Sequence, residues 1–378
     1  MIPLRLVWLV LEGILIGFFL RFGSSEALGL AIVLFLIPLV TIPINLYVKK
    51  KIHASLAAEG NLRKGGTGEF ILSIVNPTVF PVLRVGCSVQ TQNQLNRQNQ
   101  TIRVYTWLPP RREQKISVSV GSDYCGRLRL AVPKVVLYDC FGLLGIWCKV
   151  NTVGHLTVQP DTFEPNISLV PNANCIEESD VYSQERPGAD LTETFQIREY
   201  VPGDSPRQVH WKLSSKFDRL IVRDPALPIT RNVLIFWERT GESGDIDIID
   251  AQAEVIVSIC KGLLDQSVQF TIGWNDTDRN LCILHEIHDM DELIGMIPRL
   301  MRATGIKEGV GGVELLLQTG AHALCAHMVY VAEQPQQGIA ELERYGHVTK
   351  LLCGTTALDG AIIFDPKHYA EQLSQIDL

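Results

Sequence analysis

The sequence lacks the short motifs that identify common catalytic and nucleotide-binding sites. It has no G-x-S-x-G, H-E-x-x-H, P-loop or G-x-G-x-x-G segment, and these segments carry nucleophile elbows, zinc sites and phosphate-binding turns. It also has no C-x-x-C pair among its nine cysteines. An odd number of scattered cysteines is typical of reduced thiols, so we expect a reducing compartment and no disulfide framework.

The sequence is also poor in positive charge. The chain has a formal net charge of −7, and no basic stripe dominates its soluble part. This balance argues against a nucleic-acid partner, which normally requires a basic surface. With 378 residues, the chain is long enough for two soluble domains and a membrane segment.

What the N-terminus does contain is two apolar runs, residues 4–20 and 27–48. The second has no charged residue and is long enough to cross the roughly 30 Å hydrocarbon core of a bilayer as a helix. The first contains Arg5 and Glu12, and a carboxylate in lipid requires a partner or a proton. We therefore expect residues 1–50 to form a transmembrane helical hairpin that contacts membrane lipid.

A cleaved signal peptide is the alternative for the first run, with Ser25 and Ala27 as small residues at the cleavage site. The uncleaved second span and the weak basic region before the first run favour the hairpin. Lys49, Lys50 and Lys51 directly follow the second span. By the positive-inside rule they predict a multi-pass protein of the cell membrane whose soluble domains are cytoplasmic.

Residues 51–165 alternate apolar and polar side chains in short runs separated by turn residues. This pattern predicts a small antiparallel β-sandwich. Residues 166–196 hold two prolines, Pro171 and Pro187, and an acidic cluster with little periodicity, which is typical of a linker. The expected strands of the sandwich are 70–75, 82–90, 101–107, 115–120, 127–132 and 156–158.

Residues 197–378 alternate strand and helix patterns, so we expect an α/β domain with a mainly parallel sheet. The whole chain is thus predicted to be an α+β multidomain protein. The expected strands are 232–237, 268–274, 281–285, 326–332, 347–352 and 361–364. The expected helices are 246–264, 291–302, 313–320, 338–345 and a last one from Pro366.

The segment 198–224 is the most distinctive stretch of the chain. Pro202 and Gly203 fit the two central positions of a type II turn, and Pro206 fits the first turn of a short helix. The segment resembles the signature of the DUF58 family, roughly R-x-Y-x-P-G-D-x-x-R-x-I-x-W-x-x-S-A-R-x-G-x-L-x-V-R-E. The matching positions are Arg198, Tyr200, Pro202, Gly203, Asp204, Arg207, Trp211, Ser214, Leu220, Val222 and Arg223.

Four departures from that signature are mild: Val209 stands for Ile, Ser215 for Ala, Lys216 for Arg and Asp224 for Glu. Asp218 in place of a Gly is a larger change, although an aspartate tolerates the same turn conformations. Residues 138–144 are similar to a second D-P-F-G-L-F segment of the family, with Cys140 in place of the proline. A structural thiol is favoured over a nucleophile at Cys140, because no adjacent histidine supplies a base.

The resemblance implies a von Willebrand factor A-like fold for the C-terminal domain and a MoxR-type AAA+ ATPase as partner. A transglutaminase-like membrane protein is a further implied partner. A-like domains can bind a divalent cation on a D-x-S-x-S loop after the first strand. Here Glu238 and Thr240 only approximate that loop and Arg239 adds a positive charge, so we predict no metal and no cofactor.

Two smaller constellations have alternative interpretations. His285 and His288 lie near carboxylates and are a candidate zinc pair, but Asp289 and Asp291 are better explained as acids at the start of a helix. His210 and Ser214 are four residues apart and are the candidate base and nucleophile of a serine-type hydrolase. They lack an evident oxyanion site.

The charges of segment 198–224 are too many for an ordinary corner. They form either a structural ion-pair network or a partner-binding surface, with Trp211 expected to be buried as the anchor and with Arg207 and Lys216 expected to stay accessible. Because no complete catalytic constellation is present, we expect a non-enzymatic adaptor or scaffold. The alternatives are the Ser214/His210 hydrolase and a metal-dependent, adhesion-type A domain.

Overall fold

The computed structural model describes residues 4–58, 60–168, 182–201, 204–228, 233–325, 327–354 and 359–378. The predicted turn at Pro202 and Gly203 lies outside the described residues, as does Ala326. The chain divides into two compact units, Met1–Gln159 and Pro160–Leu378. The boundary therefore lies at Gln159, slightly before the position expected from the sequence.

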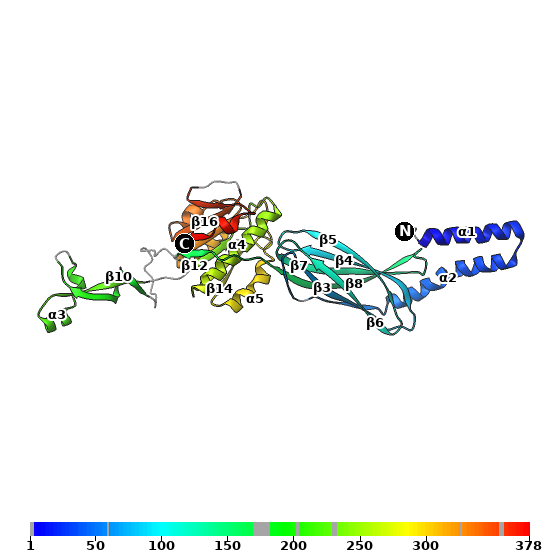
Figure 1. Ribbon diagram of the computed structural model, residues 1–378, viewed down its shortest axis with the longest axis horizontal. Coiled ribbons are helices and arrows are strands. Elements are labelled where there is room, and N and C mark those ends of the chain that lie inside the picture. Colours follow the sequence, from blue (N-terminus) through cyan, green and yellow to red (C-terminus); the bar gives the residue numbers. More distant parts are fainter. Residues whose placement is uncertain are drawn as a thin grey trace. The chain divides into compact units, whose positions relative to one another are not determined.

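The first unit begins with two antiparallel helices, α1 (Leu4–Phe22) and α2 (Ser25–Lys49) (Figure 1). The side chain of Ser24 caps α2 by accepting the N–H of Ala27. Among the described residues, α2 is the helix long enough and apolar enough to cross a membrane. The predicted apolar N-terminal helix is thus confirmed, while a second crossing by α1, which carries Arg5, Glu12 and Arg21, stays a prediction.

A hydrogen bond at a proline of α2 connects the two helices. Pro38 has no N–H, so the carbonyl of Leu34 one turn earlier loses its normal helical partner. The indole N–H of Trp8 in α1 donates to that carbonyl over 3.4 Å. The hairpin thereby satisfies a polar group that lipid would leave unpaired.

Two sheets follow and pack around a shared apolar core. The three-stranded sheet has the order β1-β3-β6 and the five-stranded sheet the order β2-β8-β7-β4-β5. All neighbours are antiparallel except β2 and β8, which are parallel. All the expected strands of this domain are present, with longer bounds than the pattern predicted. The bounds are β1 (His53–Ala57), β2 (Asn61–Arg63), β3 (Thr67–Asn76), β4 (Val82–Asn93), β5 (Asn99–Leu108), β6 (Arg112–Gly121), β7 (Gly126–Tyr138) and β8 (Gly145–Gln159).

The second unit contains two strand pairs outside its main sheet, and of their four strands the sequence indicated only the short strand after the turn at Asp218, which is β11. β9 (Asn166–Ser168) runs parallel to β18 (Gln375–Asp377), and β10 (Tyr182–Glu199) runs antiparallel to β11 (Ile221–Pro228). The interpretation of 166–196 as a linker is therefore wrong for its described residues. Their strand partners lie far along the chain, and local periodicity does not reveal such pairing.

The main sheet of the second unit has six strands in the order β14-β13-β12-β15-β16-β17. All neighbours are parallel except β14, which is antiparallel to β13. The expected mainly parallel sheet is present, with one antiparallel edge. The bounds are β12 (Val233–Trp237), β13 (Phe270–Asp276), β14 (Leu281–Ile287), β15 (His327–Ala332), β16 (His347–Cys353) and β17 (Ala361–Phe364).

Helices cover both faces of this sheet. On one face, α4 contributes Gln252, whose side chain accepts the indole N–H of Trp237. On the other face, Val313 and Leu316 of α6 pack in one cluster with Phe236. The helices of this unit are α4 (Ile246–Asp265), α5 (Met290–Leu300), α6 (Gly312–Thr319), α7 (Ile339–Leu342) and α8 (Tyr369–Gln372), with the short 3-10 turns η1 (Pro206–Gln208) and η2 (Ala321–Leu324) and the helix α3 (Trp211–Phe217).

Candidate functional site

Residues 196–224, here called the signature segment, are organised around Arg198. The guanidinium of Arg198 makes two parallel hydrogen bonds to Asp204, of 2.7 and 2.9 Å, and its Nε donates to Asp224 over 3.0 Å. A bidentate arginine–carboxylate pair fixes orientation as well as distance. The β10–β11 register, which places Arg198 beside Val222, brings Asp224 within reach.

The environment of Arg198 shifts the ionisation of both partners. The Arg198 guanidinium and the N–H of Val201 hold the pKa of Asp204 down at about 2, and the two carboxylates raise the pKa of Arg198. The Asp204 carboxylate thus connects the Arg198 guanidinium to the backbone N–H of Val201. The structure brings together Arg198 and Asp204, two of the charges of this segment, and it adds Asp224, which the sequence had marked only as a substitution.

The hydroxyl of Ser214 has a structural role in this segment. It donates to the carbonyl of His210 over 3.0 Å and accepts the N–H of Ile221 over 2.9 Å, and its side chain is buried. The His210 ring accepts the N–H of Leu213 at the start of α3. The two side chains do not form the nucleophile–base pair that the hydrolase alternative requires.

The expectation that Trp211 is the buried anchor is wrong. Its side chain is 67% exposed at the first position of α3, and Phe217 and Leu220 are exposed as well. The buried residue of α3 is instead the small, polar Ser214, whose hydroxyl accepts the N–H of Ile221 in β11. The indole side chain of Trp211 therefore faces solvent, although the sequence alone predicted that it is buried in the core.

Four cations accompany these apolar side chains: Arg207, Lys212, Lys216 and Arg219, all exposed. We call these cations together with Trp211, Phe217 and Leu220 the α3 surface. The ammonium group of Lys216 lies 5.8 Å from the centre of the Phe217 ring. Arg207 and Lys216 are accessible, as expected, while Arg223 is only partly buried and Tyr200 is tied to β11 by its backbone N–H.

Asp218 ends α3 in the left-handed conformation, with φ 52° and ψ 33°. The family signature has Gly at this position, and the prediction that an aspartate adopts the same turn is confirmed. Left-handed backbone at a helix end is normally provided by Gly or Asn. This conformation costs an aspartate a small amount of free energy, and it lets the chain reverse direction into β11.

A second candidate is the carboxyl end of β12, next to β15, where the order of the strands along the sheet reverses direction. In open α/β sheets this switch point is the usual ligand site. Here Glu238 fills it: one carboxylate oxygen accepts the N–H groups of Thr240 (3.0 Å) and Gly312 (2.9 Å), and the other accepts that of Val313 (3.1 Å). Gly312 is required, since a Cβ there would lie 2.7 Å from the carboxylate.

The side chains around Glu238 are also bonded to one another. Asn275 donates to the hydroxyl of Thr240 over 2.8 Å, and that hydroxyl donates to the carbonyl of Val310 over 2.9 Å. Arg239 is fully buried, with its guanidinium 4.0 Å from the Trp237 ring centre. Burial raises the pKa of Glu238, against the opposing effect of its three N–H donors. The oxygens that could hold a cation are thus directed at protein donors.

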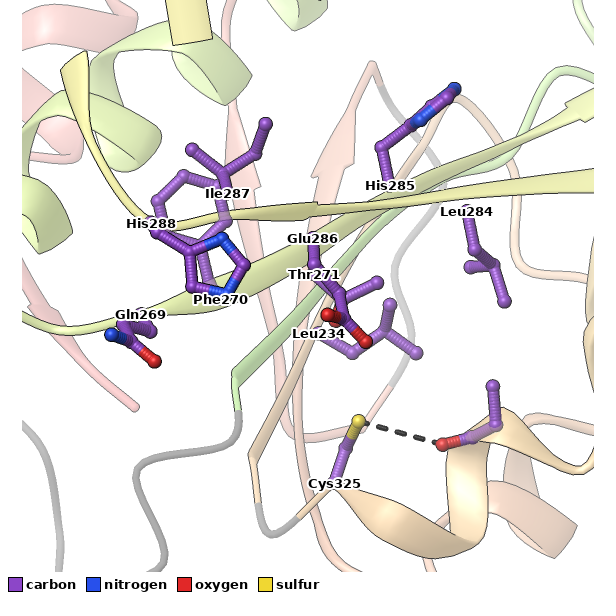
Figure 2. Close-up of a pocket in the computed structure, with 11 residues that line it drawn as sticks. Leu234, Gln269, Phe270, Thr271, Leu284, His285, Glu286, Ile287, His288 and Cys325 are labelled. Atoms are coloured by element: carbon purple, nitrogen blue, oxygen red, sulfur yellow. Dashed lines mark hydrogen bonds between the residues drawn. The ribbon is translucent and has the colours of Figure 1, made fainter. Parts of the chain in front are cut away.

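The zinc pair suggested by the sequence does not assemble. His285 and His288 lie apart at the rim of a pocket of about 520 Å³ at the amino ends of β12 and β13 (Figure 2). His288 instead pairs with Glu292, while Asp289 caps α5 by accepting the N–H of Glu292 over 2.8 Å. Among the described residues, no group of three or more His, Cys, Asp or Glu has a metal-binding arrangement.

The cysteines of the described residues are all free thiols. Burial raises the pKa of Cys87 to about 12, and burial together with the Asp139 carboxylate raises the pKa of Cys140. A raised pKa lowers the thiolate fraction, so the geometry gives Cys140 no nucleophilic activation.

Comparison with known proteins gives only distant likenesses. No protein-family model matches the chain, and no curated protein matches it. The CARDB domain of a Pyrococcus furiosus protein in complex with di-metal ions is 11% identical over 28% of this chain and 91% of that chain, with a TM-score of 0.22. A cohesin module from a Clostridium perfringens family 33 glycoside hydrolase is 9% identical over 29% and 98%, with a TM-score of 0.22. Likenesses at this level carry no argument about the present chain.

Proposed function

We propose that this protein is a membrane-anchored, non-enzymatic adaptor whose signature segment binds an AAA+ ATPase of the MoxR type. The observation that carries the proposal is the α3 surface. It exposes Trp211 and Phe217 among four cations, on a helix that is joined to β11 by the Ser214 hydroxyl and by the backbone N–H of His210, which donates to the carbonyl of Ile221. Exposed aromatic and arginine side chains on a rigid support are typical of binding hot spots.

Two features favour an adaptor over an enzyme or a metal-dependent adhesion domain. The Ser214 hydroxyl, the candidate nucleophile, is engaged by backbone groups on both sides. The Glu238 carboxylate, in the place of the cation-binding loop, is engaged by three N–H groups. Each candidate chemical group therefore already has a structural task.

The fold supports the family part of the proposal. We assign the C-terminal sheet to the von Willebrand factor A-like type and the chain to the DUF58 family. The support is the strand order of the six-stranded sheet, with its antiparallel edge strand β14, together with the signature positions around Arg198. A transglutaminase-like membrane protein is a second partner that this family assignment suggests.

The proposed location is the cell membrane, with both helices crossing it and the soluble domains in the cytoplasm. α2 supports the anchor through its length and composition, and Lys49, Lys50 and Lys51 at its end support the orientation. The free thiols of the described cysteines agree with a reducing compartment.

Recovery of the ATPase from native membranes tests the proposal. The full chain is captured with its partners, and the AAA+ ATPase is quantified by mass spectrometry for the parent, Trp211→Ala and Trp147→Ala. Trp147 is 65% exposed on β8 and is thus the matched control. Loss of a central aromatic hot spot costs about 2 kcal/mol, roughly a thirtyfold weaker Kd.

We expect Trp211→Ala to lose the ATPase and Trp147→Ala to retain it. An Arg207→Ala/Lys216→Ala variant should weaken recovery in the same direction without unfolding, because both side chains are exposed. Undiminished recovery of the ATPase with both α3 variants would remove the α3 surface from the interface.

A further inference from the structure

The end of the sandwich next to the helical hairpin exposes apolar side chains on its loops. Val79 and Phe80 lie on one loop, Leu83 at the start of the strand that follows it, β4, and Leu144 on another loop, with Leu83 the most exposed at 61%. We call these loops, together with the strand residues that flank them (76–84, 109–112 and 139–144), the rim. Apolar groups gathered at loop tips and left to water usually mark an interaction surface.

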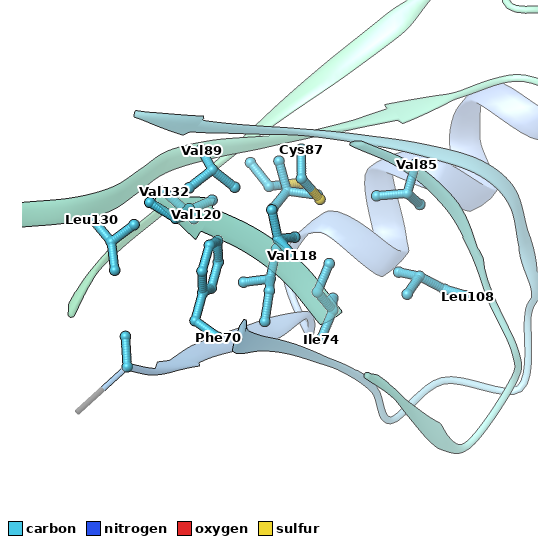
Figure 3. Packing of buried hydrophobic residues seen from close by; sticks show 14 of the residues in the cluster. Phe70, Ile74, Val85, Cys87, Val89, Leu108, Val118, Val120, Leu130 and Val132 are labelled. Carbon is cyan, nitrogen blue, oxygen red and sulfur yellow. The ribbon is translucent and has the colours of Figure 1, made fainter. Parts of the chain in front are cut away.

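The rim loops are held rigidly. Asn76 is fully buried, and its amide donates to the carbonyls of Phe80 (2.9 Å) and Pro109 (3.1 Å) while its oxygen accepts the N–H of Thr78 (3.1 Å). One side chain therefore fixes two of the three loops. They cover the end of the core where Ile74, Val85 and Leu108 pack (Figure 3).

Asp139 fixes the third loop in a similar way. Its two carboxylate oxygens accept the N–H groups of Phe141 (3.1 Å) and Leu144 (2.7 Å). This explains the aspartate of the Tyr138–Leu144 motif as a structural residue. It also means that Leu144 is presented to its surroundings by a preorganised loop.

The rim is continuous with the hairpin. The ring centres of Phe80 and Tyr47, near the end of α2, are 6.2 Å apart in an edge-to-face arrangement. The ring centres of Phe141 and Trp8 of α1 are 6.4 Å apart. The Asn45 amide donates to the carbonyl of Tyr138 over 3.1 Å. The loops therefore lie at the level where α2 leaves the proposed membrane, flanked by Trp and Tyr side chains of the kind that gather at bilayer interfaces.

The charge around the rim is positive. Lys49 ends α2 and is followed by Lys50 and Lys51, while Arg111 lies in the second loop and Arg112 at the start of β6, all of them exposed. Within the three loops Asp139 is the single acid, and its oxygens accept backbone N–H groups. Cations near a bilayer surface are attracted to anionic lipid headgroups by about 1 kcal/mol each.

We propose that the rim binds the membrane surface: Val79, Phe80, Leu83 and Leu144 enter the interfacial layer, and the surrounding cations contact anionic headgroups. The sandwich is then seated on the bilayer and does not hang from a flexible tether. This inference rests on α2 crossing the membrane, which is part of the proposed function, and it is independent of the ATPase.

The test uses the full chain in phosphatidylcholine vesicles with and without phosphatidylglycerol. An environment-sensitive fluorophore is attached at Phe80→Cys, Leu144→Cys, Leu36→Cys in α2, or Gln98→Cys in the exposed turn between β4 and β5. The parent protein, treated in the same way, shows how much fluorophore attaches to the native cysteines. Nitroxide lipids, with the spin label near the headgroup or deep in the chain, then quench whatever lies at their depth.

We expect several-fold stronger shallow quenching at residues 80 and 144 than at 98, with deep quenching at 36. Phosphatidylglycerol should increase the shallow quenching, and Arg111→Gln/Arg112→Gln should reduce that increase. Labels at 80 and 144 that stay as water-accessible as the label at 98, while 36 is quenched, would overturn the rim proposal alone. An unquenched label at 36 would overturn the membrane anchor and the rim proposal together. Energy transfer between rim labels on two copies, without quenching by lipid, would mean that the rim joins two protein chains and would overturn the rim proposal.

Discussion

Arg198 shows how one residue can order a segment that has few apolar contacts. Its side chain joins β10, the turn that begins at Val201 and β11 through two carboxylates. A charged group that is paired on two sides holds geometry well even where each pair contributes little energy in water.

The pairing makes the signature segment sensitive to acid. The folded-state pKa of Asp204 is depressed from 3.8 to about 2, so its stabilising contribution is present above pH 3.8 and is lost as the pH falls toward 2. We expect hydrogen exchange in the peptide that spans Val201, corrected for the intrinsic rate, to increase over this interval.

Asp204→Asn should remove most of this pH response and leave the segment loosened at every pH. Asp218→Asn is the matched control, because Asp218 is exposed and Asn also tolerates its left-handed backbone. An unchanged acid response in Asp204→Asn would show that another group dominates the titration.

Residue environments were the hardest feature to predict from the sequence. The pairing of Arg198 with Asp204 follows from a short spacing, whereas its pairing with Asp224 depends on a strand register over 26 residues. The exposure of Trp211 could not be predicted either, since hydrophobicity favours burial but the small Ser214 fills the contact with β11. Both outcomes depend on tertiary packing.

At the scale of elements, Glu238 links the end of β12 to the start of α6. The first N–H groups of a helix have no partner within the helix, and Glu238 satisfies those of Gly312 and Val313 from a distant part of the chain. The carboxylate is therefore a cap supplied by another element, although the sequence suggested only an incomplete metal loop.

Glu238→Ala should destabilise the second unit by about 1–3 kcal/mol, because three buried N–H groups lose their acceptor. Thermal unfolding of the full chain measures the effect, with the exposed Glu286→Ala on β14 as control. The melting temperature of the parent should be the same in magnesium and in chelator. A magnesium-dependent increase that Glu238→Ala abolishes would instead establish a cation site.

Periodicity predicted most elements of both units. The alternation in residues 70–75 and the helical spacing in 246–264 place β3 and α4 correctly, because their apolar residues recur with the period of a strand and of a helix. β18 was missed since it has three residues, and β10 was missed since its sequence is polar and contains Pro187. Such strands depend on their partners for definition.

At the scale of the whole molecule, membrane orientation is the property with the widest consequence. Lys49, Lys50 and Lys51 predict that everything after α2 is cytoplasmic. A reporter that is active only outside the cytoplasm, joined to Leu378 through a flexible linker, should be silent. A cytoplasmic reporter at the same position should be active, and the reverse pair of results would invert the topology.

The pairing of β9 with β18 has a mechanical consequence. The strands are parallel, and the N–H of Asn166 and that of Leu378 close the two ends of the ladder with bonds of 2.8 Å. A pulling force applied between the membrane anchor and Leu378 would act on opposite ends of two parallel strands, so their hydrogen bonds would be loaded in shear and would have to break together. An ATPase that pulled on the chain from Leu378 would have to break these bonds at the first step, before any strand of the main sheet was disturbed.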